Sequence, residues 1–515
     1  MTRPSAIRRD AVAAGALAHD PAGVISFWAA ADPDLVAIRW GRDVLTYGEL
    51  DRRVSDLADA MSRAGAGPGH RVAIVGENEP DVVSSIFAAW RAGAWAVPLN
   101  ARYTAREITT IIGHADPYLV VVVGDAQARH AGTFRLGEAT SEPAMVRRPD
   151  ASPEPVDASP AERTVLMLYT SGTTGAPKGV MLPSRALAFM AGLWAHRPVT
   201  AADRIYQALP ISHSYGLCSY LFGALNIGCD IELTSRFDPE ELRRAFAEGL
   251  ALFQGVPAMY ARYLQHLAQT GTTHHAPALK AISTGGAPLD PALKARVEAE
   301  FGISLRQAFG LTEAGPTVTV PDSAPQPATA LGHPAPGAGV RLVEPDGEIT
   351  DGPAEMWVRT PGVMKGYFRD EKATAAVLTP DGWLKTGDIV RRAADGVLHI
   401  VGRAKDVIIR SGFNVYPAEV EAVLLSHPSV LHAAVVGRPI DGSDESVVAF
   451  IELASGASAG VDELLAHAAK DLAGYKRPCE LYILDRMPMG LSGKVATAEL
   501  KAQAATPKAA GRTAR

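Results

Sequence analysis

The first third of the chain alternates short apolar runs with longer segments in which apolar residues recur at helical spacing. The runs at 71–75 and 118–123 have the length of buried strands, whereas the segments at 47–64 and 105–114 have the spacing of helices. An alternation of strand and helix favours parallel strands. We therefore expect an α/β fold whose large N-terminal domain is built of α/β layers.

The pattern changes twice further along the chain. From about Gly332, short strands and turns predict a small β-barrel-like subdomain. The charged, glycine-bearing segment VGRAKD at 401–406 then separates two strands, and strand and helix alternate again, with a helix predicted from Pro417. We expect a large domain at 1–402, a hinge at 403–406, and a small, mobile α+β C-terminal domain at 407–515 with a frayed basic tail.

Composition narrows the classes of protein to consider. Apolar residues make up 47% of the 515 residues and charged residues 21%, as in soluble globular proteins. The most apolar segment, 82–97, is interrupted by Arg91 and is shorter than the roughly 18–20 residues of a membrane span. A net charge of −6 argues against nucleic acid as a partner. Cys218, Cys229 and Cys479 are too scattered for a disulfide framework or a zinc site, which indicates a reducing, cytoplasmic location.

The segment LMLYTSGTTGAPKG at 166–179 carries the clearest chemistry. An apolar run ends there in a loop of small and hydroxyl residues, which lets backbone N–H groups approach an anion, and Lys178 adds a mobile positive charge. A Walker A loop is excluded because Pro177 and Gly179 flank the lysine where that pattern needs glycine and Ser or Thr. The loop therefore predicts a site for nucleotide phosphates. Taken alone, a polar turn is an open alternative.

A second group of residues lies in QAFGLTEAGP at 307–316. Phe309 beside Gly310 can cover the face of a purine, and Thr312 next to Glu313 can serve phosphate and magnesium together. An ordinary turn with a solvated glutamate is the alternative for this string on its own. Upstream, STGGAP at 283–288 follows an apolar run and leaves backbone groups open to a ligand.

Together these strings resemble the signatures of the adenylate-forming superfamily. That superfamily contains the acyl- and aryl-CoA synthetases, the adenylation domains of peptide synthetases, and firefly luciferase. The resemblance extends from about Leu45 to Leu500, with the motifs in the family's order. It implies a two-step reaction, in which a carboxylate attacks the α-phosphate of MgATP to give acyl-AMP and pyrophosphate. The small domain then turns, and a thiol attacks the acyl carbonyl and releases AMP.

The resemblance also assigns the nucleotide site. Phe309 would stack on adenine in place of the family's usual tyrosine, Thr312 would touch phosphate, and Glu313 would help to hold Mg²⁺. Asp388, in WLKTGD, would accept both ribose hydroxyls, and Arg403 would contact ribose or phosphate. The phosphate loop would supply Thr170, Ser171, Gly172, Thr173, Thr174, Gly175 and Lys178, and the segment lining adenine would supply Gly285, Gly286 and Ala287.

Further roles fall on the hinge and the small domain. Lys405 occupies the family's hinge position. Lys494, at the end of MGLSGK, matches the family's late catalytic lysine, which draws carboxylate and phosphate together, although the residues around it lack the family's usual basic groups. A lone lysine in this place would more often be a solvated side chain. The resemblance also implies that the approach of the thiol is lined by Ser411, Gly412, Phe413 and Asn414, with assistance from Tyr475 and Lys476.

The acid would bind beside LPISHSYGL at 209–217. By resemblance His213 is the family's gating ring, and a structural histidine is the alternative. Between Pro210 and Tyr220 there is no acidic residue, which disfavours an amino acid, and no Arg or Lys, which argues against a dicarboxylate. We therefore expect an uncharged fatty or aromatic acid. The pocket would be completed by Ser214, Tyr215, Gly255, Gly286, Gly310, Pro316 and Thr317.

The leading hypothesis is thus an AMP-forming acyl-CoA synthetase that uses ATP, Mg²⁺ and coenzyme A. A stand-alone adenylating enzyme that loads a carrier protein is the alternative, and a luciferase-like oxidation ranks lower. A non-catalytic nucleotide-binding relative is disfavoured because the chain retains Lys178, Glu313, Asp388 and Lys494. We expect small-molecule partners, no nucleic acid and no transmembrane segment, and we leave a homodimer open.

Overall fold

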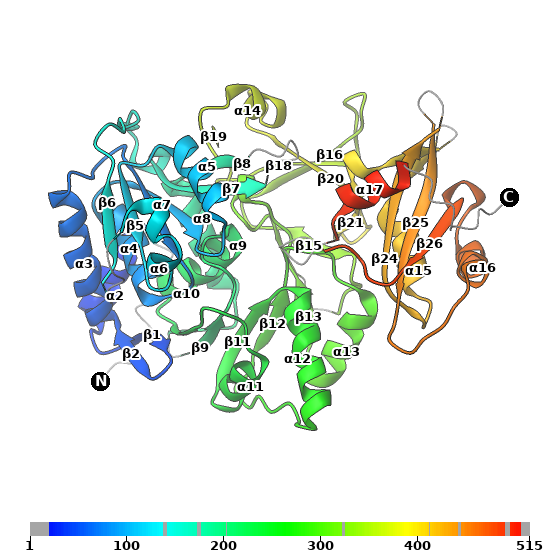
Figure 1. The fold of residues 1–515 in the computed structure, drawn as a ribbon, viewed down its shortest axis with the longest axis horizontal. Coiled ribbons are helices and arrows are strands. Elements are labelled where there is room, and N and C mark those ends of the chain that lie inside the picture. The colour runs from blue at the N-terminus through cyan, green and yellow to red at the C-terminus, as the bar shows by residue number, and fades with distance from the viewer. Residues whose placement is uncertain are drawn as a thin grey trace.

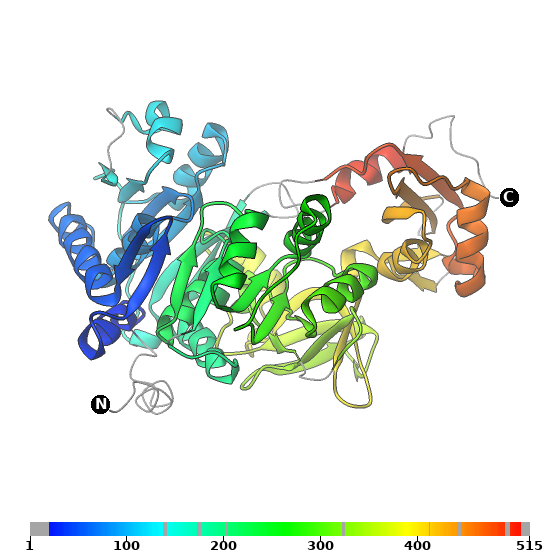
Figure 2. The same cartoon turned by 90° about the horizontal axis from the view of Figure 1, so that it is seen from below.

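The computed structural model describes residues 20–136, 142–171, 177–201, 203–321, 325–410, 413–440, 444–489 and 495–505. They form a large body of three seven-stranded sheets, with a smaller body beside it that carries the C-terminal elements (Figures 1 and 2). Within the described ranges, no helix is long and apolar enough to cross a membrane.

The first sheet confirms the predicted alternation of strand and helix. Its order is β19-β8-β7-β4-β3-β5-β6, with parallel pairing among β7, β4, β3 and β5 and antiparallel strands outside them. Thr46 and Thr104 begin two of its helices with capping boxes to Glu49 and Glu107, which satisfy backbone N–H groups at each start. The strands are β3 (Arg71–Gly76), β4 (Trp95–Asn100), β5 (Leu119–Val122), β6 (Ala144–Arg147), β7 (Thr164–Ser171), β8 (Pro177–Pro183) and β19 (Gly366–Tyr367). The helices are α2 (Gly23–Ala31), α3 (Tyr47–Arg63), α4 (Pro80–Arg91), α5 (Ala105–Ala115), α6 (Ala126–Arg129), α7 (Ala131–Phe134) and α14 (Glu371–Val377).

The second sheet is also mainly parallel, in the order β13-β12-β11-β9-β10-β1-β2. One hydrophobic core combines residues of both sheets with α4 and α8, and separate clusters cover their other faces, so the two sheets are layers of one unit. The strands are β1 (Val36–Trp40), β2 (Asp43–Thr46), β9 (Arg204–Gln207), β10 (Asp230–Leu233), β11 (Leu250–Gly255), β12 (Ala281–Thr284) and β13 (Leu305–Gln307). The helical segments are α8 (Ser184–Leu193), α9 (Ser214–Gly216), η3 (Leu217–Phe222), α10 (Gly223–Asn226), α11 (Pro239–Ala247), α12 (Pro257–Thr270) and α13 (Pro291–Phe301).

The third sheet is the β subdomain that the sequence predicts. It is antiparallel throughout, in the order β14-β15-β21-β20-β18-β16-β17, and no pairing between its two edges closes it into a barrel within the described residues. Its strands are β14 (Thr319–Val320), β15 (Ala330–Pro334), β16 (Gly339–Val343), β17 (Ile349–Thr350), β18 (Ala354–Arg359), β20 (Leu384–Arg392) and β21 (Leu398–Arg403).

The small body has two hydrophobic clusters of its own. The helix predicted from Pro417 is present, and it buries Val420 and Leu424. The expected hinge coincides with a single helical turn at Ala404–Asp406, although the proposed limits of the two domains stay a prediction. The elements here are β22 (Ile408–Arg410), β23 (Phe413–Val415), α15 (Pro417–Leu425), β24 (Val430–Pro439), β25 (Glu445–Leu453), α16 (Val461–Asp471), β26 (Glu480–Leu484) and α17 (Thr497–Ala505).

Candidate active site

The predicted phosphate loop joins two antiparallel strands of the first sheet. β7 and β8 pair up to the loop, with Thr170 opposite Lys178 and Ser171 opposite Pro177. Lys178 therefore lies at the base of the loop. Four expected phosphate ligands, Gly172, Thr173, Thr174 and Gly175, lie outside the described residues, as does the side chain of Ser171.

Tyr367 brings the loop lysine and the predicted metal ligand together. The Lys178 Nζ lies 4.8 Å from the centroid of the Tyr367 ring, and the Tyr367 hydroxyl donates a hydrogen bond of 3.0 Å to Glu313 Oε1. Burial and the neighbouring Glu313 carboxylate raise the pKa of Tyr367, which keeps the hydroxyl protonated and a donor. This tyrosine was missed by the sequence analysis, because its partners lie far away in the chain.

The main chain connects the same three residues. β19 pairs with β8, placing Tyr367 beside Val180, and the amide of Met364 donates to the carbonyl of Glu313. Glu313 is thus fixed through both its backbone and its side chain. The short segment from Met364 to Tyr367 therefore holds both the strand that carries Lys178 and the turn that carries Glu313.

The loop after β13 is folded tightly on itself. A Cβ added to Gly310 would lie 1.9 Å from the Pro316 carbonyl oxygen, so no larger residue fits without movement. Phe309 is held by its amide, which donates to Thr319 Oγ1, and by its carbonyl, which accepts from Val318. The expected adenine-stacking ring therefore stands on a rigid support.

Hydroxyl pairs join this loop to the predicted acyl segment. Ser214 Oγ and Thr312 Oγ1 lie 2.8 Å apart, and Ser219 Oγ and Thr317 Oγ1 lie 3.1 Å apart, all four residues being buried. Asn78 holds the same segment from the first sheet by bonds to the backbone of Leu209 and Ile211. The structure thus brings Ser214 to Thr312 and the neighbouring Ser219 to Thr317.

Tyr215 lies against the glycines after β12. A Cβ on Gly285 would lie 3.0 Å from the Tyr215 hydroxyl, and one on Gly286, which has a φ of +74°, would lie 3.9 Å from Cδ1. Ala287 continues this turn, and Gly255 ends the neighbouring strand β11. His213 is exposed and caps α9, because its Nδ1 accepts from the amide of Tyr215.

The predicted ribose ligand lies on the third sheet. Asp388 on β20 is opposite Arg403 on β21, and Arg403 Nε lies 2.6 Å from Asp388 Oδ1. The Asp388 side chain is only 3% exposed, and its charge is compensated by Arg403, whose side chain is 53% exposed. Lys405 lies two residues further, exposed in the turn at Ala404–Asp406.

The small body carries the residues expected to guide the thiol. Phe413 is 55% exposed and stacks on Tyr475, with ring centroids 4.7 Å apart. Within the described residues, no hydrogen bond or ring contact joins this pair to the site residues of the large body. Ser411, Gly412 and Lys494 lie outside the described residues, and the segment that contains Lys494 is flanked by a bridge between Met489 and Val495.

The side chains near the phosphate loop suit a magnesium ion that is bound mainly through the phosphate oxygens of a nucleotide. The described residues contain no group of three His, Cys, Asp or Glu side chains that could enclose a metal. Mg²⁺ commonly binds through one or two carboxylates together with substrate phosphates and water. Glu313, held by Tyr367 through one oxygen, fits that role.

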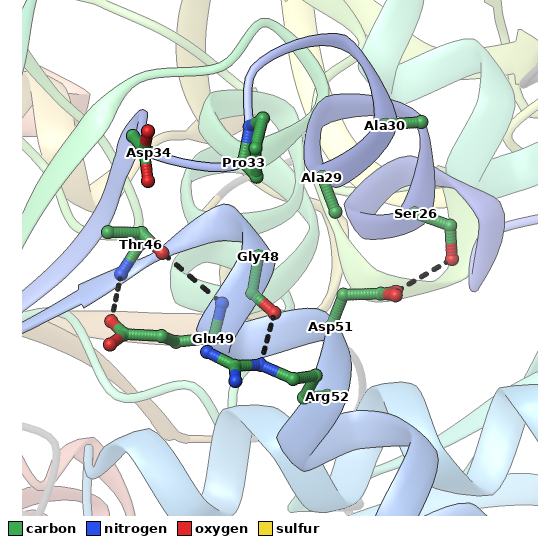
Figure 3. Close-up of a pocket in the computed structure, with 10 residues that line it drawn as sticks. All are labelled: Ser26, Ala29, Ala30, Pro33, Asp34, Thr46, Gly48, Glu49, Asp51 and Arg52. Carbon is green, nitrogen blue, oxygen red and sulfur yellow. Dashed lines mark hydrogen bonds between the residues drawn. The ribbon is translucent and has the colours of Figure 1, made fainter.

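A hollow of about 520 Å³ between α2 and α3 is a different feature (Figure 3). Most of its polar groups are engaged in the local structure: Thr46 and Glu49 form the capping box of α3, Ser26 donates to Asp51, and Arg52 donates to the carbonyl of Gly48. None of the predicted site residues lines it. We therefore assign it no chemistry.

Comparisons with known proteins agree with this geometry. The family described as AMP-binding enzyme matches residues 25–368, and the AMP-binding enzyme C-terminal domain matches residues 419–494. The chain belongs to the AMP-binding enzyme family. The resemblance to the adenylate-forming superfamily is confirmed, and so is the fold class.

Similar proteins match along almost the whole chain. A feruloyl-CoA synthase from an Amycolatopsis species is 36% identical and covers 91% of this chain and 96% of its own. An indoleacetate–CoA ligase from Aromatoleum aromaticum is 33% identical, over 90% of this chain and 94% of its own. The crystal structure of ATP-bound MatB from Rhodopseudomonas palustris superposes with a TM-score of 0.81 at 28% identity, over 94% of this chain and 99% of that one.

Proposed function

We propose that this AMP-binding enzyme is an AMP-forming carboxylate–CoA ligase. The observation that carries the proposal is that Tyr367 contacts two predicted ligands at once. Its ring lies beside Lys178 of the phosphate loop, and its hydroxyl donates a hydrogen bond to Glu313. A positive group and a metal-binding carboxylate at one place are what a triphosphate bound with magnesium requires. The similarity to CoA ligases over about nine-tenths of the chain supports the same reaction.

The residues then divide the work of adenylation. Phe309 covers adenine, Asp388 accepts from the ribose hydroxyls, and Lys178 neutralises phosphate charge. Glu313 would hold Mg²⁺, which would supply further charge neutralisation. An oxygen of the acid attacks the α-phosphorus, the bond to the pyrophosphate oxygen breaks, and pyrophosphate leaves. Lys494 offsets the repulsion between carboxylate and phosphate. The chain contributes positioning and charge rather than a nucleophile.

The second step joins the acyl group to a thiol. The sulfur of CoA attacks the acyl carbonyl, its proton goes to solvent, and AMP leaves with the electrons of the acyl–phosphate bond. Phe413 and Tyr475 line the approach of the thiol, and rotation about Lys405 brings them to the site. We place this reaction in the cytoplasm, consistent with three free cysteines, and keep the homodimer as a prediction.

We propose an aromatic acid as the substrate in preference to a fatty acid. The predicted pocket residue Tyr215 lies against Gly285 and Gly286, and an aromatic side chain beside glycines offers a flat surface that suits a ring. Feruloyl-CoA synthase and indoleacetate–CoA ligase, by their names, act on aryl acids. Loading of a carrier protein is the second candidate acceptor reaction, favoured by the exposed Phe413–Tyr475 pair, which a protein surface could cover.

The test is mass spectrometry of products from a panel of benzoates, cinnamates, arylacetates and fatty acids with MgATP, with and without CoA. We expect an aryl-CoA to form. Acyl-AMP that accumulates despite CoA would favour carrier loading, and absence of any adenylate would refute the proposal. Lys494→Ala should abolish adenylation but spare thioester formation from supplied acyl-AMP, and equal loss of both steps would contradict its role.

A further inference from the structure

A half-buried arginine lies next to the predicted acyl pocket without an acidic partner. Arg197 follows α8, its Nη1 donates a hydrogen bond of 2.8 Å to Gln254 Oε1, and its guanidinium lies 4.6 Å from the centroid of the Trp194 ring. Within the described residues, no carboxylate lies within ion-pair distance of Arg197. A charge that has lost part of its hydration is normally paired, so this arrangement requires an explanation.

Two groups beside Arg197, the Gln254 amide nitrogen and the Tyr215 hydroxyl, are donors that lack an acceptor. Gln254 Oε1 also receives the Ser283 hydroxyl, at 3.4 Å, which fixes the orientation of the amide and leaves Gln254 Nε2 as the free end. That nitrogen is buried without a partner, and so is the Tyr215 hydroxyl. We call Arg197, Gln254 and Tyr215 the donor cluster. What the cluster lacks is an oxygen acceptor.

The strand register places a second cation on the same face. β11, β12 and β13 lie side by side (Figure 1), with Gln254 opposite Ser283 and Ser283 opposite Arg306. Side chains at paired positions of parallel strands point to one face of the sheet. Arg306 also has no carboxylate at ion-pair distance within the described residues. Burial lowers the pKa of Arg197, in keeping with a cation that has lost water without gaining an anion.

The donor cluster adjoins the pocket rather than the phosphate site. Gln254 directly precedes Gly255, and the Tyr215 hydroxyl lies against Gly285. Trp194, under the guanidinium, donates to the carbonyl of Ser219, whose hydroxyl bonds Thr317. Ser214 bonds Thr312, the residue assigned to phosphate, whereas Arg197 contacts Gln254 and Trp194 instead.

We propose that the donor cluster receives an oxygen acceptor at the far end of the acid, so that the substrate is an acid with a remote hydroxyl, carbonyl or carboxylate group. This inference rests on the proposed function and narrows its substrate class. The segment between Pro210 and Tyr220 contains no Arg or Lys, which led the sequence analysis to disfavour a charged acid. Arg197 and its partner Gln254 lie outside that segment, so the sequence analysis did not consider them.

The experiment compares matched acids that differ only in the remote group. Pyrophosphate release is measured with 3-phenylpropanoate, with 3-(4-hydroxyphenyl)propanoate and with 3-(4-carboxyphenyl)propanoate. We expect kcat/KM to be higher by about tenfold or more for an acid with the acceptor, since the unsubstituted acid leaves buried donors unpaired. Preference for the hydroxyl acid identifies a neutral acceptor, and preference for the carboxyl acid identifies an anionic one.

Arg197→Met should abolish this preference by lowering kcat/KM for the substituted acid while sparing the unsubstituted acid. Tyr215→Phe removes a single hydroxyl and should reduce the preference in the same direction, which keeps the test valid if Arg197→Met fails to fold. Arg262→Met is the matched control. Arg262, on α12, also lies over an aromatic ring, that of Phe237, but it is not part of the donor cluster. It should leave the preference unchanged.

Equal kcat/KM for the three acids in the wild type would overturn the inference, as would an Arg197→Met variant that loses activity on all of them in the same proportion. The proposed function would survive either result, because adenylates would still form. It fails separately if no acid in the wider panel yields an adenylate.

Discussion

At the scale of single residues, the Tyr367 hydroxyl ties the phosphate loop to the predicted metal ligand. Tyr367→Phe keeps the ring beside Lys178 but removes the donor to Glu313. A hydrogen bond to a charged group contributes about 1.5–3 kcal/mol. We therefore expect the Mg²⁺ concentration for half-maximal adenylation to rise roughly tenfold. Titration of a fluorescent ATP analogue at several Mg²⁺ concentrations would show the same shift without turnover.

Tyr118→Phe is the control for this variant. Tyr118 also donates its hydroxyl to a protein acceptor, the carbonyl of Ala64, but in a different part of the first sheet. The control should keep the wild-type Mg²⁺ dependence. If Tyr367→Phe changes only the unfolding temperature, the tyrosine has a structural role and the positioning role is refuted.

Glu421 makes the stability of the small body depend on pH. Burial raises the pKa of Glu421 to about 7, against an ordinary value of 4.5. The native protein keeps this proton in a range where the unfolded chain has lost it, so the contribution of Glu421 to stability falls as pH rises from about 4.5 to 7. Glu421→Gln keeps an acceptor for the Val435 amide and should unfold at a higher temperature than the wild type at pH 8 but not at pH 4.5.

Thermal unfolding between pH 4.5 and 8 checks this expectation. Glu499→Gln, on the exposed surface of α17, is the control and should follow the wild-type curve. Parallel curves for Glu421→Gln and the wild type would show that Glu421 does not take up the proton.

Sequence reasoning finds residues that lie in contiguous motifs and misses those that depend on contacts across the fold. Lys178 and Glu313 are recognisable because neighbouring residues identify them. Tyr367 meets Glu313 across 54 positions of the chain, and Arg197 meets Gln254 across 57. Nothing in the local pattern of either residue distinguishes it from a core tyrosine or a surface arginine.

At the scale of elements, the loop after β13 depends on a close approach of two backbone segments. Gly310→Ala would force a methyl group against the Pro316 carbonyl, and overpacking of this kind costs about 1–3 kcal/mol. Since Phe309 and Thr312 flank the glycine, we expect weaker binding of ATP together with lower stability. Gly113→Ala, in α5 with no atom near the added methyl group, should be neutral or stabilising by up to about 1 kcal/mol.

Chemical denaturation and ATP titration of the two variants check this prediction. Wild-type affinity for ATP in Gly310→Ala would mean that the loop relaxes without moving Phe309. The contrast between two identical substitutions separates a loss of backbone fit from any general effect of alanine.

Regular elements were more predictable than short ones. The strands at 71–75 and 118–123 and the helix from Pro417 have clear periodicity, and the structure contains them. β19 has only two residues, and its pairing with β8 is decided by tertiary packing. The π-helical segment Leu217–Phe222, which carries Ser219 and Tyr220 beside the pocket, has no distinctive sequence signal.

At the scale of the whole molecule, the distribution of cores determines how the chain unfolds. The largest cluster joins all three sheets, since it contains Leu168, Ile231 and Val390. The clusters of the small body use residues from Ile408 onward. A shared core makes the three sheets one cooperative unit, whereas the small body has its own.

Calorimetry of the full chain should therefore show two transitions, of which MgATP raises only the larger. The ligands predicted for adenine, ribose and metal, Phe309, Asp388 and Glu313, all belong to the large unit, and a ligand at 100 times its Kd adds about 2.7 kcal/mol to the unit that binds it. For a unit of this size that is a rise of about 3 °C. Asp388→Asn should lose most of the rise and keep both transitions. A single transition that moves as a whole would mean that the large and small bodies unfold as one cooperative unit.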